Sequence, residues 1–142
     1  MKGHLATATT SIAAAPELVW QALTDPAKVE QYFLGTRVES AWRVGAPITW
    51  SGEYQGRAYT DHGRITGFDP GRLLEFTHFS PLSGLPDLPD NHHLVRFELA
   101  PAADGTDVRL SQDGNADAAE AQRATATWQQ VLDGLKRVVE AG

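Results

Sequence analysis

The stretch TWQQVLDGLKRVVE (residues 127–140) decides the fold. Its apolar side chains, from Trp128 to Val139, recur at steps of three and four residues, which is typical of an amphipathic helix. Small residues extend the same stripe toward the N-terminus, so we expect one helix over about 116–140. At 1.5 Å per residue such a helix is roughly 35 Å long, enough to cross a whole sheet. We expect a packing reason for Gly134, inside it, and a bend of the helix is the alternative.

Six extended segments precede this helix in a row. They alternate apolar and polar residues and are separated by turn signals such as DPGR (69–72). Consecutive strands joined in this way favour an antiparallel meander. A seventh strand, HLATATTSI (4–12), is expected near the N-terminus. The six strands of the meander are expected at 36–42, 46–54, 57–68, 73–79, 93–99 and 106–112.

Two short helices are expected between the first strand and the meander. Pro16 opens one, and a second follows with Pro26 in its first turn, where Thr24 or Asp25 can cap it. A sheet must cover its apolar face, and the terminal helix is the only predicted element long enough to do so. The sequence therefore predicts an α+β fold, as a single domain over 1–142. In it, a curved antiparallel sheet of about six to seven strands wraps around a long C-terminal helix.

Composition excludes several classes of partner. The chain has 142 residues, 12 basic and 18 acidic, with a net charge of −6 and no cluster of lysine or arginine. Phosphate backbones and anionic membranes attract concentrated positive charge, so we expect neither as a partner. No apolar run is long enough to span a bilayer, and there is no cysteine. We expect a cytoplasmic protein, and we predict no cofactor, because zinc-ligand spacing and a phosphate-binding loop are missing from the sequence.

Three segments carry a resemblance to a known family. They are VWQALTDPAKVEQYF (19–33), GRITGFDPGRLLEF (63–76) and the terminal stretch 127–140. In this order they resemble the START-like, helix-grip superfamily, and within it the polyketide cyclase-related domain of the activator of Hsp90 ATPase. The resemblance covers nearly the whole chain and implies the helix-grip fold; bacterial members are mostly ligand-binding or uncharacterised domains. The eukaryotic co-chaperone carries its ATPase-stimulating motifs on a second, N-terminal domain, so we do not expect Hsp90 activation by this chain.

A pocket is expected where the curled sheet and the single helix fail to close completely. Strand alternation turns Trp50 and the ring of Phe76 toward the terminal helix, which carries Trp128. Each aromatic residue alone could be plain core, but ligand pockets have such apolar walls with a few fixed polar groups. We therefore predict a pocket for a small apolar or aromatic molecule whose identity the sequence does not give. Its expected lining is Phe33, Trp42, Trp50, Tyr54, Tyr59, Phe76, His78, Phe97, Trp128 and Leu132.

The stretch HFSPLSGLPDLPDNHH (78–93) joins two adjacent strands and is too long for a tight hairpin. Three prolines stiffen it. It also offers apolar side chains that a purely solvated loop would not need, so we expect a lid at the rim of the pocket. The lid residues are Leu82, Leu85 and Leu88.

A metal site in the same loop is the alternative. His78 and His93 could meet across the strand pair, with Asp87 or Asp90 as a third ligand. His92 cannot join them, because neighbouring strand residues point to opposite faces. We predict no metal site.

Catalysis is the second hypothesis for the function. The stretch YTDHGR (59–64) could include a general acid or base, but Asp61 and His62 should lie on opposite faces of their strand. We predict no catalytic residues, and keep open a cyclase-like or hydratase-like enzyme that uses His62, His78 or Tyr59 on a ketone-like substrate.

A chaperone-partner module is a third alternative. An exposed strand edge would support a homodimer.

Overall fold

The computed structural model describes residues 1–33 and 35–142, and its elements follow the predicted order. Two short 3-10 turns lie in the loop between the fifth and sixth strands, at Pro81–Ser83 and Pro89–Asn91. The helices and strands are β1 (His4–Ile12), α1 (Pro16–Thr24), α2 (Pro26–Tyr32), β2 (Arg37–Ser40), β3 (Pro47–Tyr54), β4 (Arg57–Asp69), β5 (Leu73–His78), β6 (His93–Ala102), β7 (Gly105–Asn115) and α3 (Ala118–Ala141).

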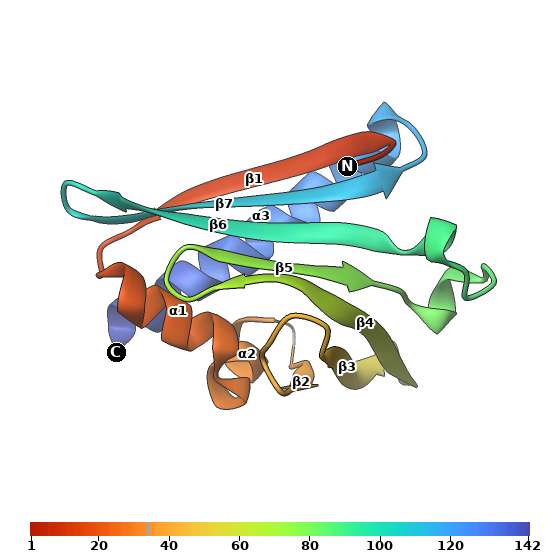
Figure 1. Ribbon diagram of the computed structural model, residues 1–142, viewed down its shortest axis with the longest axis horizontal. Helices are drawn as coiled ribbons and strands as arrows, with labels where there is room; N and C mark the ends of the chain where they lie inside the picture. The colour runs from red at the N-terminus through yellow and green to blue at the C-terminus, as the bar shows by residue number, and fades with distance from the viewer. Residues whose placement is uncertain (34) are drawn as a thin grey trace.

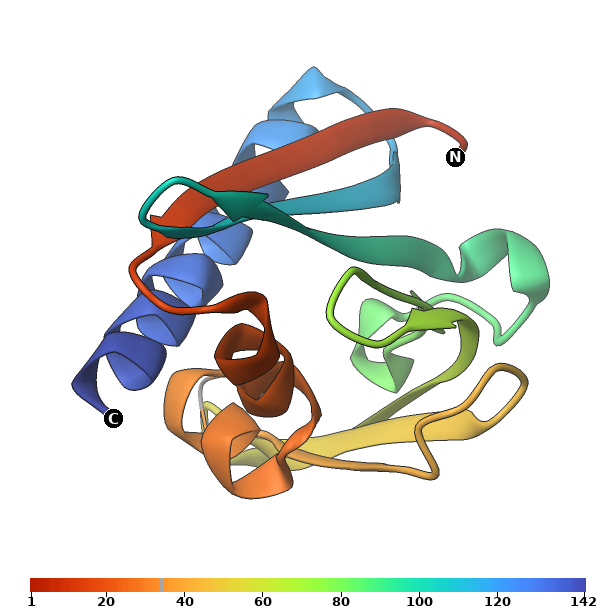
Figure 2. The ribbon, with the colours of Figure 1, turned by 60° about the vertical axis from the view of Figure 1, so that its left-hand side comes forward.

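Within the described residues the sheet has seven antiparallel strands in the order β1-β7-β6-β5-β4-β3-β2. Strands β2 to β7 form the meander, and β1 returns to pair with β7. The sheet curls strongly, and α3 runs across its inner side while α1 and α2 lie near the C-terminal end of α3 (Figures 1 and 2). The predicted helix-grip architecture is therefore confirmed.

The long helix α3 is held by an apolar stripe and by one close contact. Val131, Leu132 and Leu135 are almost completely buried. At Gly134 a Cβ atom would come within 3.1 Å of the carbonyl oxygen of Tyr32, so α3 packs directly on the end of α2. The glycine inside the helix thus has the packing role that the sequence suggests. Across the described residues, no helix combines the length and the apolar character needed to cross a membrane.

Polar side chains of α3 also reach the edge strand β1. Gln129 Nε2 donates to the carbonyl oxygen of Thr9 over 3.1 Å, and Lys136 Nζ donates to that of Ser11 over 2.6 Å. Glu140 accepts a hydrogen bond from the backbone N–H just after β1, and this bond, with the nearby ammonium of Lys136, lowers the pKa of that carboxyl. Backbone groups of β1 that no neighbouring strand uses are therefore satisfied by the helix.

Strand β4 is the longest strand and links the two halves of the sheet. Residues 57–64 pair with β3, whereas residues 65–69 pair with β5. The register with β5 shifts between Ile65 and Gly67, and an isolated bridge joins His62 to Phe79. Between these points, a Cβ atom at Gly63 would lie only 1.7 Å from the carbonyl oxygen of Thr77. Only glycine fits this approach of two backbones.

Candidate functional site

A pocket of about 470 Å³ lies between α3 and strands β3 to β5. This volume falls in the usual range of ligand pockets, roughly 300–1,000 Å³. The end of α2, the start of β2 and the loop after β5 complete its walls. Its lining residues are Phe33, Thr36, Trp50, Glu53, Tyr59, Asp61, His78, Ser80, Leu82, Ser83, Thr127, Trp128 and Val131.

The residues expected to line the pocket divide into three groups. Five of them, Phe33, Trp50, Tyr59, His78 and Trp128, line it, as does Leu82 of the expected lid. The side chains of Trp42, Phe76 and Phe97 instead surround a gap of about 20 Å³ in the core, and Leu132 is fully buried. Leu85 and Leu88 are outside the lining and about half exposed. The side chain of Tyr54 lies outside the described part of the structure.

The aromatic side chains of the pocket wall are fixed by contacts with one another. Trp128 meets Phe33 edge to face, with ring centroids 5.7 Å apart, and lies against Phe97 at 6.4 Å. Its indole N–H donates to Gln112 Oε1 over 2.5 Å. Trp50 packs on Phe76 with a centroid distance of 5.0 Å. Such pairs add about 0.5–1.5 kcal/mol each beyond their buried area, so the wall is stiff.

A carboxylate and an imidazole meet on the sheet side of the pocket. Asp61 Oδ2 lies 2.9 Å from His78 Nε2, and the two side chains are only 15% and 29% exposed. The second carboxylate oxygen, Oδ1, is buried and has no hydrogen-bond partner in the described structure. The bridge at His62 and the close approach at Gly63 bring the two residues together across β4 and β5. Sequence reasoning missed this pair, because it considered Asp61 only beside its chain neighbour.

A second polar group lies on the pocket wall. Tyr59 and Thr36 join their hydroxyl oxygens at 2.7 Å. Tyr59 stands opposite Gly52 in the β3–β4 register, and a Cβ atom at Gly52 would come within 2.8 Å of the phenol oxygen. The glycine therefore leaves room for the ring to cross β3 and reach Thr36. Both hydroxyls already have a partner, unlike the free oxygen of Asp61.

The loop after β5 is tied down on the other face of β4. Asp87 lies between two imidazoles, with Oδ2 2.9 Å from His62 Nε2 and Oδ1 2.6 Å from His92 Nε2. The hydrogen bond with His92, helped by the charge of His62, lowers the pKa of the Asp87 carboxyl. The ring of His92 also stacks on Phe79 at 5.1 Å. These contacts fix the middle of the loop to the sheet.

The histidines considered as metal ligands use other partners. His78 bonds to Asp61, whereas His93 Nδ1 lies 2.8 Å from the carbonyl oxygen of Asp113 in β7. His92 and His93 have separate partners, as strand alternation predicts. Within residues 1–33 and 35–142, no three histidine, aspartate or glutamate side chains are grouped so that they could hold a metal ion.

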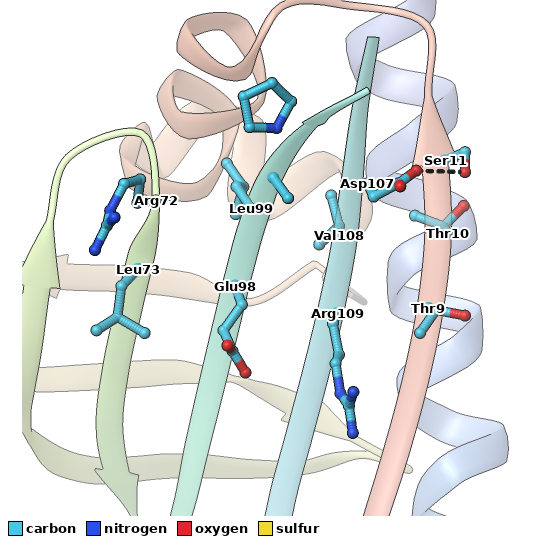
Figure 3. Close-up of a pocket in the computed structure, with 12 residues that line it drawn as sticks. Thr9, Thr10, Ser11, Arg72, Leu73, Glu98, Leu99, Asp107, Val108 and Arg109 are labelled. Carbon is cyan, nitrogen blue, oxygen red and sulfur yellow. Dashed lines mark hydrogen bonds between the residues drawn. The ribbon is translucent and has the colours of Figure 1, made fainter. Parts of the chain in front are cut away.

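A second hollow, of about 800 Å³, lies on the sheet face turned away from α3 (Figure 3). Glu98, Arg109 and Arg72 project from this face, and Ser11 donates a hydrogen bond to Asp107 over 2.8 Å. Its lining mixes both signs of charge and includes no aromatic side chain. The inner pocket, with aromatic walls and a buried carboxylate, is therefore the candidate functional site.

Comparison with known proteins agrees with this architecture. A family model described as "Activator of Hsp90 ATPase homolog 1-like protein" matches residues 13–140. The chain is 40% identical to ChR145 of Cytophaga hutchinsonii, with a TM-score of 0.86 over 99% of this chain and 97% of that one. The Aha1 dimer from Colwellia psychrerythraea (20% identity, TM-score 0.76, 98% of each chain) shares the fold. DynU16 of the dynemicin biosynthetic locus also shares the fold, with 21% sequence identity and a TM-score of 0.79 over 99% of this chain and 49% of that chain. No curated protein matches the sequence significantly.

Proposed function

Because the chain belongs to the family of activator of Hsp90 ATPase homolog 1-like proteins, we propose that it is a ligand-binding domain that holds a small, largely apolar molecule in the inner pocket. The observation that carries this proposal is the pocket itself. Space of about 470 Å³ remains between α3 and the sheet although the neighbouring core is tightly packed. Ligand pockets have such volumes and mostly apolar walls with a few polar groups, so a pocket of this size and lining supports a binding role.

The walls favour a flat, apolar occupant. Trp50, Trp128 and Phe33 present aromatic surface, and Leu82 closes the rim from the loop. A two-ring aromatic molecule would bury about 200 Å², which corresponds to about 5 kcal/mol at 25 cal/mol/Å² before the costs of association. This free energy corresponds to a Kd of about 0.2 mM, and the costs of association weaken it, so we expect simple aromatic probes to bind in about the millimolar range.

Two measurements test the proposal. Native mass spectrometry of the purified protein should show a co-purified small molecule that is released on denaturation. Titration with the neutral dye N-phenyl-1-naphthylamine should show saturable binding that Thr127→Trp weakens, because Thr127 lines the pocket from α3.

The matched control is Gln130→Trp, on the exposed side of the same helix. It should leave the affinity for the dye unchanged. Equal dye binding by the two variants and the parent protein would mean that the dye does not enter the pocket, and the proposal would be lost.

A second candidate function is favoured by one observation, the 2.9 Å contact between Asp61 and His78 inside the pocket. A cyclase-like or hydratase-like enzyme acting on a ketone needs two such groups within hydrogen-bond reach. Its test is proton exchange: the methyl protons of 2-acetylnaphthalene in D₂O, followed by NMR, should exchange faster with the protein than with His78→Phe. Equal rates with the protein, with the variant and in buffer alone would exclude this activity for that ketone.

A further inference from the structure

The hydrogen-bond roles of His78 are fixed by its neighbour. An ionised carboxylate only accepts hydrogen bonds, so the contact of Asp61 Oδ2 with His78 Nε2 requires the proton of the neutral imidazole on Nε2. The other ring nitrogen, Nδ1, is then an acceptor. None of the hydrogen bonds within the described residues involves that nitrogen. The imidazole that lines the pocket therefore carries an acceptor that no described protein group uses.

The ring is held in place from two sides. Trp50 meets the imidazole edge to face at a centroid distance of 5.0 Å, and Asp61 holds it through the carboxylate. Both side chains line the pocket, and that of His78 is the more exposed, at 29% against 15% for Asp61. An acceptor that is already oriented loses little freedom when a ligand binds to it.

From this arrangement we infer that the pocket selects aromatic molecules that carry a hydroxyl group, with His78 accepting the hydrogen bond of that hydroxyl and Asp61 positioning the ring. The inference rests on the proposed function and names the chemical class of its ligand. A hydroxyl buried among Trp50, Trp128 and Phe33 must find an acceptor, because an unpaired buried hydroxyl is costly. The hydroxyls of Tyr59 and Thr36 pair with each other, and the imidazole nitrogen of His78 is a stronger acceptor than a hydroxyl oxygen.

Two probes of the same shape test the selection. They are 2-naphthol, which carries the hydroxyl, and 2-methoxynaphthalene, which cannot donate. The protein should bind 2-naphthol about five- to tenfold more tightly, as one additional hydrogen bond implies. In the double variant Asp61→Leu, His78→Phe, which removes both the imidazole and the carboxylate as acceptors and keeps an aromatic ring against Trp50, the ratio of the two affinities should fall to about one.

Controls separate the loss of the acceptor from damage to the fold. His4→Phe, at an exposed position, should keep the ratio of the parent protein. If the double variant Asp61→Leu, His78→Phe fails to fold, Asp61→Asn, His78→Phe keeps the shape of both side chains without a buried charge, and it should still lower the ratio because a neutral amide oxygen is a weaker acceptor than a carboxylate.

Asp61→Asn tests the positioning role of the carboxylate. Nitrogen-15 NMR of the parent protein should show the neutral His78 ring protonated on Nε2, and the variant should lose this preference. Selectivity for 2-naphthol should then fall about two- to fivefold while the affinity for 2-methoxynaphthalene stays the same. A purely structural Asp61 would instead weaken both probes alike and leave the protonated nitrogen unchanged.

The outcomes distinguish the inference from the proposed function. Equal affinity of the parent protein for the two probes would overturn the hydroxyl selection and leave the binding function in place. Binding of neither probe, together with no binding of the naphthylamine dye, would overturn the proposed function.

Discussion

Gly63 of β4 lies against the carbonyl oxygen of Thr77 in β5, so closely that a Cβ atom would come within 1.7 Å of that oxygen. The His62–Phe79 bridge stands immediately before this contact along β4. Any side chain at Gly63 would push the two strands apart, and the separation would fall beside the pair formed by Asp61 and His78. The geometry of the candidate site thus depends on a residue with no side chain.

Gly63→Ala should therefore lower the free energy of unfolding by about 1–3 kcal/mol or more, because the backbone oxygen of Thr77 cannot move aside cheaply. Urea unfolding followed by circular dichroism measures the change. Gly67→Ala is the matched control on the same strand. Its Cβ atom would meet only side-chain atoms, the nearest at 3.1 Å, so we expect a change below about 1 kcal/mol. Equal losses in the two variants would contradict this account.

Trp128→Phe should cost about 2 kcal/mol, because the variant leaves the buried amide oxygen of Gln112 without its indole donor. Gln112→Met in the same background removes the stranded oxygen. We therefore expect the double variant to be less destabilised than the sum of the single variants, by about 1 kcal/mol. Denaturant unfolding of all four proteins gives this coupling. Strict additivity would show that the hydrogen bond adds nothing to stability.

Asp87 should make the stability of the protein depend on pH at the acid end. Its pKa is lowered in the folded state, first by the hydrogen bond with His92, so its contribution is present above the ordinary aspartate pKa of about 4. The contribution is lost as the pH falls through the lowered pKa. Thermal unfolding between pH 2 and 6 should show a smaller acid-side loss in Asp87→Asn than in the parent protein.

Asp90→Asn is the control for this pH dependence, since that carboxylate lies in the same loop but is fully exposed, 3.9 Å from Lys2 Nζ. Its stability curve should follow that of the parent protein. Parallel curves for Asp87→Asn and the parent protein would show that the two imidazole contacts do not stabilise the loop.

Leu82→Ser should weaken binding of the naphthylamine dye about three- to tenfold, because Leu82 is the one expected lid leucine that lines the pocket. Leu88→Ser, in the same loop and also exposed, should leave the affinity unchanged. Fluorescence titration measures both. Equal weakening would mean that the whole loop closes over the ligand, as the sequence suggests for all three leucines.

Much of the fold could be predicted because side-chain period and element length determine it locally. The alternation that places Trp50 and Ile48 on one face of β3 is visible in the sequence, and both side chains are buried. The stripe of Val131 and Leu135 likewise identifies the face of α3 that meets the sheet. Each pattern lies within a single strand or helix, so it can be recognised without knowing how the elements pack together.

The polar part of the site could not be predicted in the same way. Asp61 and His78 are 17 residues apart and lie on different strands, so their contact depends on the β4–β5 register. That register shifts between Ile65 and Gly67 and is set by local irregularity rather than by a period of two. The contacts of Asp87 with His62 and His92 depend likewise on the path of the loop. A glycine inside a polar strand was the available signal, because it indicates close backbone approach.

The three hydrogen bonds from α3 to β1 and to the residue after it also restrict how copies of this chain can assemble. A second molecule that paired with the C-terminal half of β1 would have to displace Gln129, Lys136 and Glu140. The opposite end of the sheet is β2, only four residues long, with exposed Arg37 and Glu39. Short, charged edges are poor templates for fibre-like growth. Truncation of α3 before Lys136 would therefore remove the partners of Ser11 and of the residue after β1 and open that end of the strand to intermolecular pairing, so that a loss of stability would also promote aggregation.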